Sequence, residues 1–272
     1  MTDHDALLQA VLAAPEDDLP RLVFADFLEE SGHPANAARA KFIRLQIEAE
    51  GSSRKEELLA KAEELRPMFR DELEATLPAG FEGRWVVTHR RGFVDNAEMI
   101  FFELMAYGRW ICGLVPITSL AIPGVMLRDG QAWFQFQEYS YLSRITSLRL
   151  GPRLLELQSN YRNLDGAMSY RPATTALLDN SHLIRLLRLE VSDNQLDDEW
   201  VVIFVSGFGE ASFSDTLREL DLSNNLISDA GANTLAAGRG LDGLTLLDLR
   251  DNRLTADGIA MLRRRFGERV VV

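Results

Sequence analysis

The chain has 272 residues, of which 46% are hydrophobic and 26% are charged, so it is long enough to bury a sizeable core and is not dominated by disorder. Its formal net charge of -12 argues against a nucleic-acid backbone as the main partner, because such binding rests on Lys and Arg. A basic partner fits this charge better.

A single cysteine, Cys112, excludes an internal disulfide and a thiolate zinc site, and it indicates a reducing compartment. The sequence begins MTDHDALLQAVLAAPEDD, where acidic residues replace the basic segment of a signal peptide and the apolar run is too short to span a bilayer. We therefore predict a cytoplasmic protein that does not associate with membranes.

Four helices are expected within residues 1–80. The first contains apolar residues at helical spacing over 7–12, the second covers Leu19–Glu30, and the third runs over 34–50. The fourth covers Arg54–Leu77 and should kink or break just before Pro67, because proline cannot donate the next helical hydrogen bond. This part of the chain is predicted to be a small all-α domain.

The segment LLQAVLAAPEDDLPRLVFADFLEESGHPANAARAKFIRLQIE, at residues 7–48, is long and distinctive. It resembles the bacterial repeat-companion domain, a short helical module found ahead of leucine-rich repeats. The resemblance implies that residues 1–80 form such a domain, and it implies no catalytic activity.

Residues 81–116 are expected to cap the first strand of a repeat array. Strands over 85–89 and 93–98 should form a hairpin around the turn Arg90-Arg91-Gly92, and a helix over 101–112 should follow.

Internal repeats fill the rest of the chain. Two segments, LRELDLSNNLI (217–227) and LTLLDLRDNRL (244–254), share the pattern L-x-x-L-x-L-x-x-N-x-L and start 27 residues apart. A third full match, LLRLEVSDNQL, lies at 186–196. Two weaker copies, at 117–127 and 145–155, keep the apolar positions and lack the Asn. The leucines are predicted to point into a shared core from short strands, and the side chains of Asn194, Asn225 and Asn252 to bind backbone groups where the chain turns away.

The tails ISDAGANTLA and LTADGIAMLR follow two of these strands with helical periodicity. A unit of 27 to 28 residues with one strand and one helix resembles the ribonuclease-inhibitor class of leucine-rich repeats. The resemblance covers residues 117–272. It implies an α/β solenoid, in which a parallel sheet of about five main strands is backed by helices.

The repeat spacing is broken once. Because 41 residues separate Ile145 from Leu186, we expect an insertion at 157–171, followed by a helix that opens at Pro172 and runs to Leu178. At the other end, Val270–Val272 falls where the next strand would start. We expect a short edge strand there, and exposed edges invite pairing, so the protein is predicted to be a monomer or a weak dimer.

No arrangement of residues predicts catalysis, a cofactor or a metal site. The four histidines are scattered without a second ligand at metal-binding spacing, and Cys112 lies inside the array without a separate catalytic domain. The carboxylates of Asp26, Glu29 and Glu30 are interpreted as a solvated helix face, since no base is near them in the sequence. The chain is therefore predicted not to be an enzyme.

The concave face of the sheet is the candidate binding surface. At the fifth position of the repeats, Glu190, Asp221 and Asp248 should form an acidic column on adjacent strands, exposed to solvent. Either neighbouring arginines or a cationic partner must compensate these like charges. The predicted binding residues are Arg149, Arg188, Glu190, Asp193, Arg218, Glu219, Asp221, Asn224, Asp248, Arg250 and Asp251.

We therefore predict a non-catalytic adaptor that binds a protein partner on this concave face. The sheet face alone offers on the order of 450 Å², less than the ~800 Å² per partner of a standard interface, so the insertion or the helical domain should contribute. The alternative is a nucleic-acid-associated module, which would use the arginine-rich middle of the chain, and an enzyme is a further alternative. The arginines of that stretch are Arg144, Arg149, Arg153, Arg162 and Arg171.

Overall fold

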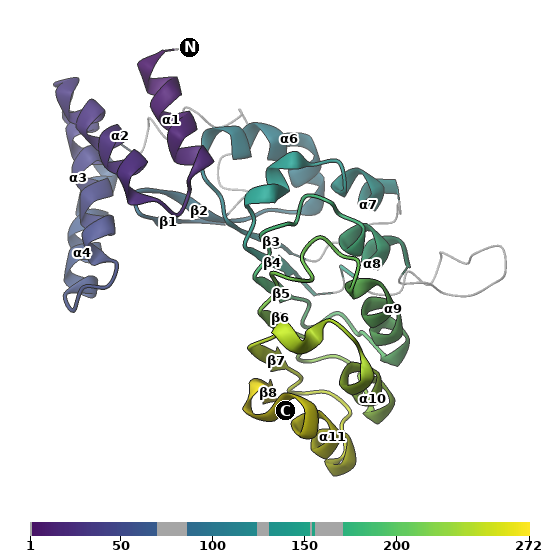
Figure 1. Cartoon of the computed structure of the whole chain (residues 1–272). Coiled ribbons are helices and arrows are strands. Elements are labelled where there is room, and N and C mark those ends of the chain that lie inside the picture. Colours follow the sequence, from purple (N-terminus) through teal and green to yellow (C-terminus); the bar gives the residue numbers. More distant parts are fainter. Residues whose placement is uncertain (1, 70–85, 124–130, 153, 156–170) are drawn as a thin grey trace. The chain divides into compact units, whose positions relative to one another are not determined.

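A computed structural model describes residues 2–69, 86–123, 131–152, 154–155 and 171–272 (Figure 1). The chain divides into two compact units. The first unit consists of Met1–Glu98 and Tyr107–Thr118, and the second of Met99–Ala106 and Ser119–Val272. The helix α6 (Phe101–Leu114) therefore contributes its first residues to the second unit and its last residues to the first.

Among the described residues of the first unit, four helices and a hairpin make up the largest part. The helices are α1 (Asp3–Ala13), α2 (Asp18–Glu30), α3 (Pro34–Ala49) and α4 (Lys55–Leu65), with a 3-10 turn, η1 (Arg66–Met68), after the last. The helix α4 ends just before Pro67, as the missing N–H of proline predicts. The predicted continuation of this helix beyond residue 69 lies outside the described residues.

Local sequence explains where these helices begin and end. A capping box of Thr2 and Asp5 starts α1, the Asp17 carboxylate accepts the Leu19 N–H at the start of α2, and Pro34 occupies the first turn of α3. Just beyond α2, Gly32 has a φ of 69°, which an L side chain rarely adopts. The predicted bounds of α2 and α3 are confirmed to within one residue.

The hairpin consists of the antiparallel strands β1 (Val86–Arg90) and β2 (Phe93–Glu98). Its two turn residues, Arg91 and Gly92, have φ values of 52° and 83°, which suit the right-handed twist of the strands. Phe93, at the start of β2, is buried in one core cluster with Val11, Phe24 and Ile43 from the helices. The hairpin and the helices therefore share a hydrophobic core.

In the described part of the second unit, six parallel strands follow one another across the sheet in chain order. They are β3 (Ser119–Ile122), β4 (Ser147–Leu150), β5 (Arg188–Glu190), β6 (Glu219–Asp221), β7 (Leu246–Asp248) and β8 (Val270–Val271). The expected parallel sheet and the short edge strand near Val270 are thereby confirmed.

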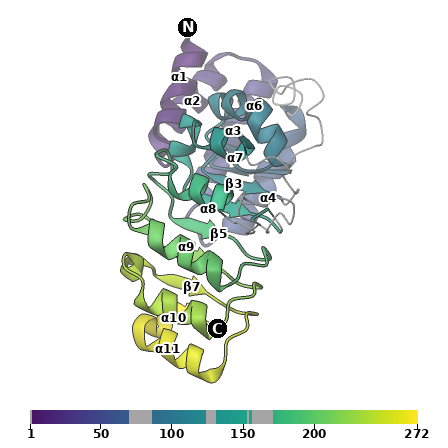
Figure 2. The same ribbon diagram turned by 90° about the vertical axis from the view of Figure 1, so that its right-hand side faces the viewer.

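Helices on one side of this sheet return the chain from each strand to the next (Figures 1 and 2). They are α7 (Gln131–Phe136), α8 (Arg171–Leu178), α9 (Asp198–Phe208), α10 (Asp229–Ala237) and α11 (Ala256–Phe266), and short 3-10 turns precede β4, β7 and β8: η2 (Ser140–Arg144), η3 (Leu241–Gly243) and η4 (Gly267–Arg269). The described helix α8 is the one expected to open at Pro172. Most of the predicted insertion at 157–171 lies outside the described residues.

Leucines at one position of each strand form the core of the second unit. Leu148, Leu189, Leu220 and Leu247 pair in register across β4 to β7, and each is fully buried. On the helix side, the stacked rings of Trp200 and Phe204 lie 4.9 Å apart, and further phenylalanines continue the contact. No repeat could bury these leucines alone, so stacking supplies the driving force.

Replacing one of these central leucines tests the stacked core. We expect Leu220→Ala or Leu247→Ala to lower the free energy of unfolding by about 2 to 5 kcal/mol, because each removes buried methyl groups and leaves a cavity. Denaturant midpoints measure this, with Val202→Ala on the exposed side of α9 as the control. Midpoints unchanged by both leucine variants would contradict the stacking.

Candidate functional site

Neighbouring repeats are joined by Asn194, Asn225 and Asn252, which lie at the turns after β5, β6 and β7. The Asn225 Oδ1 accepts the N–H groups of Asn194 and Leu196, each at 3.0 Å, and its Nδ2 donates to the Val191 carbonyl at 3.1 Å. Asn225 is 4% exposed, so water does not compete for these bonds. Its side chain thus satisfies backbone groups of the preceding repeat.

The other two asparagines repeat this geometry. Asn194 accepts the Leu155 N–H at 2.9 Å and donates to the Leu150 carbonyl at 3.0 Å. Asn252 accepts the Ile227 N–H at 3.0 Å and donates to the Leu222 carbonyl at 2.9 Å. Each asparagine therefore fixes the turn of the repeat before it, which keeps the strands in register.

A second row of contacts, which the sequence analysis missed, joins the helices of successive repeats. The Asp198 carboxylate, at the start of α9, accepts from the Ser228 N–H at 2.8 Å, from the Ser228 hydroxyl at 2.5 Å and from the Gly231 N–H at 2.9 Å. One repeat later, Asp229 accepts from the Thr255 N–H at 2.9 Å and from its hydroxyl at 2.5 Å.

Glycine is required beside this row. A Cβ on Gly231 would lie 2.5 Å from the Asp198 Oδ1, and Gly258 bears the same relation to Asp229. The shared Ser/Thr-x-x-Gly spacing in ISDAG and LTADG was the available signal for these contacts.

The side chains on the other side of the sheet from the buried leucines form the outer sheet face. It consists of the third, fifth and seventh positions of the repeats that contain β4 to β7, counted from the first apolar residue of the pattern L-x-x-L-x-L-x-x-N-x-L. Pairing places Arg149, Glu190, Asp221 and Asp248 in one row at the fifth position. The row thus starts with a basic residue and continues with three acidic residues.

Arginines within the sheet neutralise part of this row. The Arg149 Nε lies 3.3 Å from the Glu190 carboxylate, and Arg188 lies 3.6 Å from Glu190 and 3.3 Å from Glu219. The like charges were expected to be compensated either by neighbouring arginines or by a cationic partner. For Glu190 and Glu219, neighbouring arginines provide the compensation. Within the described residues, no Lys or Arg forms a salt bridge with Asp221, whose carboxylate accepts the Ser223 N–H at 2.9 Å.

Asp248 does not have the exposure expected of it. The residue is 6% exposed, and its carboxylate accepts from the Arg250 backbone N–H at 3.0 Å and from the Arg250 Nη2 at 2.6 Å. The expectation that the whole acidic column is exposed is wrong at this position, because the Arg250 side chain folds back over the carboxylate. Replacing Asp248 would therefore disturb the fold as well as the surface.

The residues at the eighth position have a conformational role. Asp193, Asn224 and Asp251 have φ values of 58°, 53° and 56°. Asp and Asn adopt this left-handed conformation more readily than other non-glycine residues, so the turn itself accounts for their presence. Arg218 is also occupied locally, since its guanidinium donates to the carbonyls of Asp215 and Leu217.

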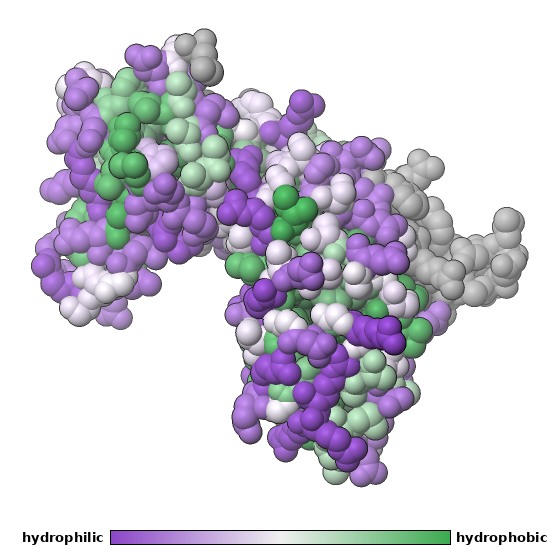
Figure 3. All heavy atoms as spheres, viewed as in Figure 1, coloured by the Kyte–Doolittle hydropathy of each residue, from purple (hydrophilic) through white to green (hydrophobic). Residues whose placement is uncertain are grey.

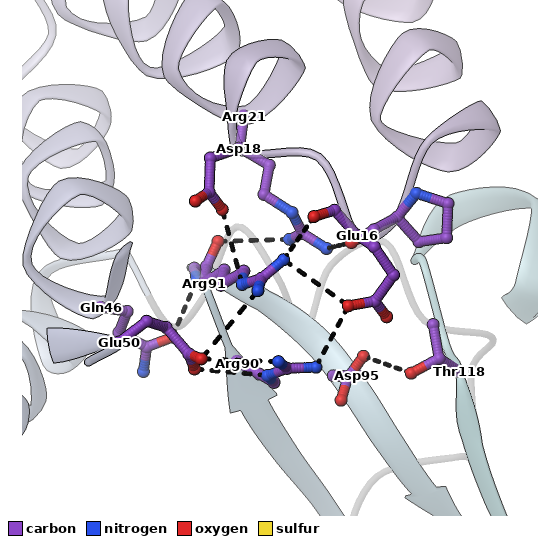
Figure 4. A network of polar contacts seen from close by, with 11 residues as sticks. Glu16, Asp18, Arg21, Gln46, Glu50, Arg90, Arg91, Asp95 and Thr118 are labelled. Carbon is purple, nitrogen blue, oxygen red and sulfur yellow. Dashed lines mark hydrogen bonds and ion pairs between the residues drawn. The ribbon is translucent and has the colours of Figure 1, made fainter. Parts of the chain in front are cut away.

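In the first unit, the hairpin turn is enclosed by polar groups from the helices (Figure 4). The Arg91 guanidinium donates to the Glu16 carbonyl at 2.6 Å and lies 3.4 Å from the Asp18 carboxylate. Arg90 lies 3.3 Å from Glu50 and 3.5 Å from Glu16. Charges far apart in the sequence therefore hold the turn against the α1–α2 connection, the start of α2 and the end of α3.

Two uncharged contacts and one buried cation complete this network. The Gly92 N–H donates to the Gln46 Oε1 at 2.7 Å, and a Cβ on Gly92 would lie 2.6 Å from the Ile43 Cα, so only glycine fits. The Arg21 guanidinium, 1% exposed, donates to the carbonyls of Pro15 and Arg91. Burial lowers the Arg21 pKa to about 10, so the side chain stays charged at neutral pH.

Residues 214–236 and 244–262 match the model of the family described as Leucine Rich repeat. The chain contains leucine-rich repeats. Among solved structures, an internalin from Listeria monocytogenes is similar, with 19% sequence identity and a TM-score of 0.28. That match covers 57% of this chain and 48% of the internalin, so it spans about half of the internalin chain. No curated protein matches the chain.

The other residues considered for chemistry do not come together. In the part of the chain that the structure describes, no three His, Cys, Asp or Glu side chains could hold a metal ion. Burial, with a smaller contribution from nearby arginines, lowers the His89 pKa to about 4, so this imidazole is neutral at pH 7. His4 packs against Phe24, and Cys112 is buried.

The carboxylate group on α2 has a basic partner after all. The Arg44 Nη2 lies 2.6 Å from Asp26 and 2.8 Å from Glu29. Arg44 is 18 residues from Asp26 in the sequence, so this ion pair was not predicted. No helix among the described residues has both the length and the apolar composition needed to cross a membrane.

Three of the five arginines of the middle stretch, Arg144, Arg149 and Arg171, lie in the described residues. Arg149 is engaged by Glu190, and Arg144 closes a 3-10 turn before β4. Arg171 begins α8, and Arg153 and Arg162 lie outside the described residues.

The pH dependence of stability tests the role of Asp248. Burial alone would raise its pKa, but hydrogen bonds and charge from Arg250 outweigh burial and hold the pKa below the usual 3.8. Ionised Asp248 therefore stabilises the fold above about pH 4, and this contribution is lost as the pH falls through the lowered pKa.

We expect Asp248→Asn to have a lower free energy of unfolding than the original protein at pH 7, and the two free energies of unfolding to converge as the pH falls below the usual pKa of 3.8 and through the lowered pKa of Asp248. Asp251→Asn, exposed and in a conformation that Asn tolerates, is the matched control. A difference that stays constant over this pH range would contradict the assignment.

Proposed function

We propose that this protein is a non-catalytic interaction module that binds a protein partner on the outer sheet face of its repeats. The observation that carries the proposal is that, apart from the buried Asp248, the charged side chains of this face lie outside the core, which the leucines on the opposite face supply. A surface free of core packing can carry side chains chosen for a partner.

The ion pairs of this face favour specific recognition. Arg149, Glu190, Arg188 and Glu219 already hold one another before a partner arrives, so fewer rotamers would have to be ordered on binding. Alternating charges also disfavour partners whose own charges are in the wrong order.

The partner is proposed to carry basic residues opposite β6. Asp221 lies in the row between Glu190 and Asp248, and the described residues provide no salt bridge for it. Residues 191–272 contain 14 acidic and 8 basic residues, so the surrounding potential has the same sign.

The sheet face is smaller than a standard interface, and the partner is therefore proposed to contact a second surface as well. We also propose the domain organisation that the resemblance implies, with a repeat-companion domain at 1–80, a cap at 81–116 and the solenoid at 117–272. A cytoplasmic location belongs to the same proposal, since the single cysteine forms no internal disulfide.

Affinity capture from the native host, followed by mass spectrometry, would supply the partner for a direct test. We expect the double variant Glu219→Lys/Asp221→Lys to bind this partner about ten-fold more weakly, with slower association at low salt, because complementary potentials steer the encounter. The free energy of unfolding of the double variant should differ from that of the original protein by no more than about 1 kcal/mol, since both side chains are partly exposed.

The control variant is Glu210→Lys, which makes the same charge change at an exposed site beyond the end of α9. An affinity and an association rate equal to those of the original protein, in a folded double variant, would refute binding at the outer sheet face.

A further inference from the structure

In the described part of the first unit, α1 and α2 carry exposed apolar side chains. On α2, Leu19 is 65% exposed and Val23 is 42% exposed, and the spacing of four residues puts them on one side of the helix. On α1, Ala6, Ala10 and Ala13 are exposed at helical spacing. We call these five residues the α1–α2 face.

The two helices present this surface on the same side of the unit. Figure 3 shows hydrophobic surface, in green, running over α1 and α2 in one view. Only the residues Ala14–Asp17 connect the helices, and His4 on α1 packs against Phe24 and Phe27 on α2.

Acidic residues predominate on the segment that carries this face. Residues 1–30 contain eight acidic residues and a single basic one, Arg21, which is buried. Some of the acids are paired, since Asp26 and Glu29 contact Arg44 and Glu16 contacts Arg90. Within the described residues, salt bridges are not made by Asp3, Asp17 or Glu30, and Glu30 lies seven residues after Val23 on the same side of α2.

We propose that the α1–α2 face docks an amphipathic helix of a partner protein, with apolar residues on one side and Lys or Arg on both flanks. The apolar side would cover Leu19 and Val23, and the basic flanks would meet the unpaired carboxylates. This site is separate from the outer sheet face, so either proposal can fail without the other.

The negative charge of the α1 and α2 segment favours a basic helix over the other possible partners of this face. A second copy of the chain would bring the same acidic segment against the first, and an anionic membrane would repel it in the same way. An acidic or uncharged helix would leave the carboxylates without compensation. A basic amphipathic helix is the occupant that satisfies both the apolar and the charged features.

The probe is a synthetic peptide of about 18 residues with Leu on one helical face and Lys elsewhere, titrated into the full chain in about 50 mM salt. We expect binding, with amide shifts concentrated at Ala6, Ala10 and Val23 in a heteronuclear NMR spectrum. A matched peptide with Glu in place of Lys should not bind.

The variant Leu19→Ser/Val23→Ser keeps every charge and removes the exposed apolar side chains, so it should bind the Lys peptide about ten-fold more weakly. Ala10→Arg, which adds bulk and positive charge to the exposed side of α1, should weaken binding to a similar degree without touching the core. The control is Val202→Ser on α9, 51% exposed, which should bind as the original protein does.

Equal affinity of the folded double variant and the original protein would overturn the proposal, because binding would then rest on charge alone. Dimerisation of the original protein that is lost in the double variant, or binding to vesicles of anionic lipid, would overturn it as well, since another occupant would then cover the face.

Discussion

The structure of the repeats depends on one constraint, which is that backbone N–H and C=O groups must find partners where each strand ends and the chain turns toward its helix. Buried backbone groups that lack a partner cost about 1 to 3 kcal/mol each. Asn225 meets this demand for the repeat before it, by accepting from Asn194 and Leu196 and donating to Val191. Because the asparagine belongs to the next repeat, the turn is complete only when two repeats are stacked.

Because other side chains form the core and close the turns, the outer sheet face is available for the proposed binding. Leucines supply the core, asparagines close the turns, and Asp198 and Asp229 join the starts of successive helices. The face between these structural contacts can carry ion pairs such as Arg149 with Glu190. The first unit follows a similar principle, since the turn at Arg91 is fixed by charged groups while one side of α1 and α2 remains free of packing.

Periodicity and spacing were sufficient to predict the strands, most helices and the sheet register, because each of these depends on residues within one repeat or one turn. The burial of Asp248 was not predictable, since it depends on how the Arg250 side chain folds. Contacts across many residues were also missed, such as Arg91 with Glu16, which are 75 positions apart. Asp193 was predicted to be a binding residue, although its left-handed backbone conformation is sufficient to explain an Asp there.

Amide hydrogen exchange in Asn225→Ala would test the account most directly. If the asparagine side chain pairs the backbone of the preceding repeat, the amides of Asn194 and Leu196 should exchange at least about ten-fold faster than in the original protein. The Ile227 N–H donates to the Asn252 side chain, which this substitution does not change, so its exchange should be accelerated less than that of Asn194 and Leu196. Unchanged exchange at Asn194 and Leu196 would contradict the claim that each repeat is completed by the asparagine of the next.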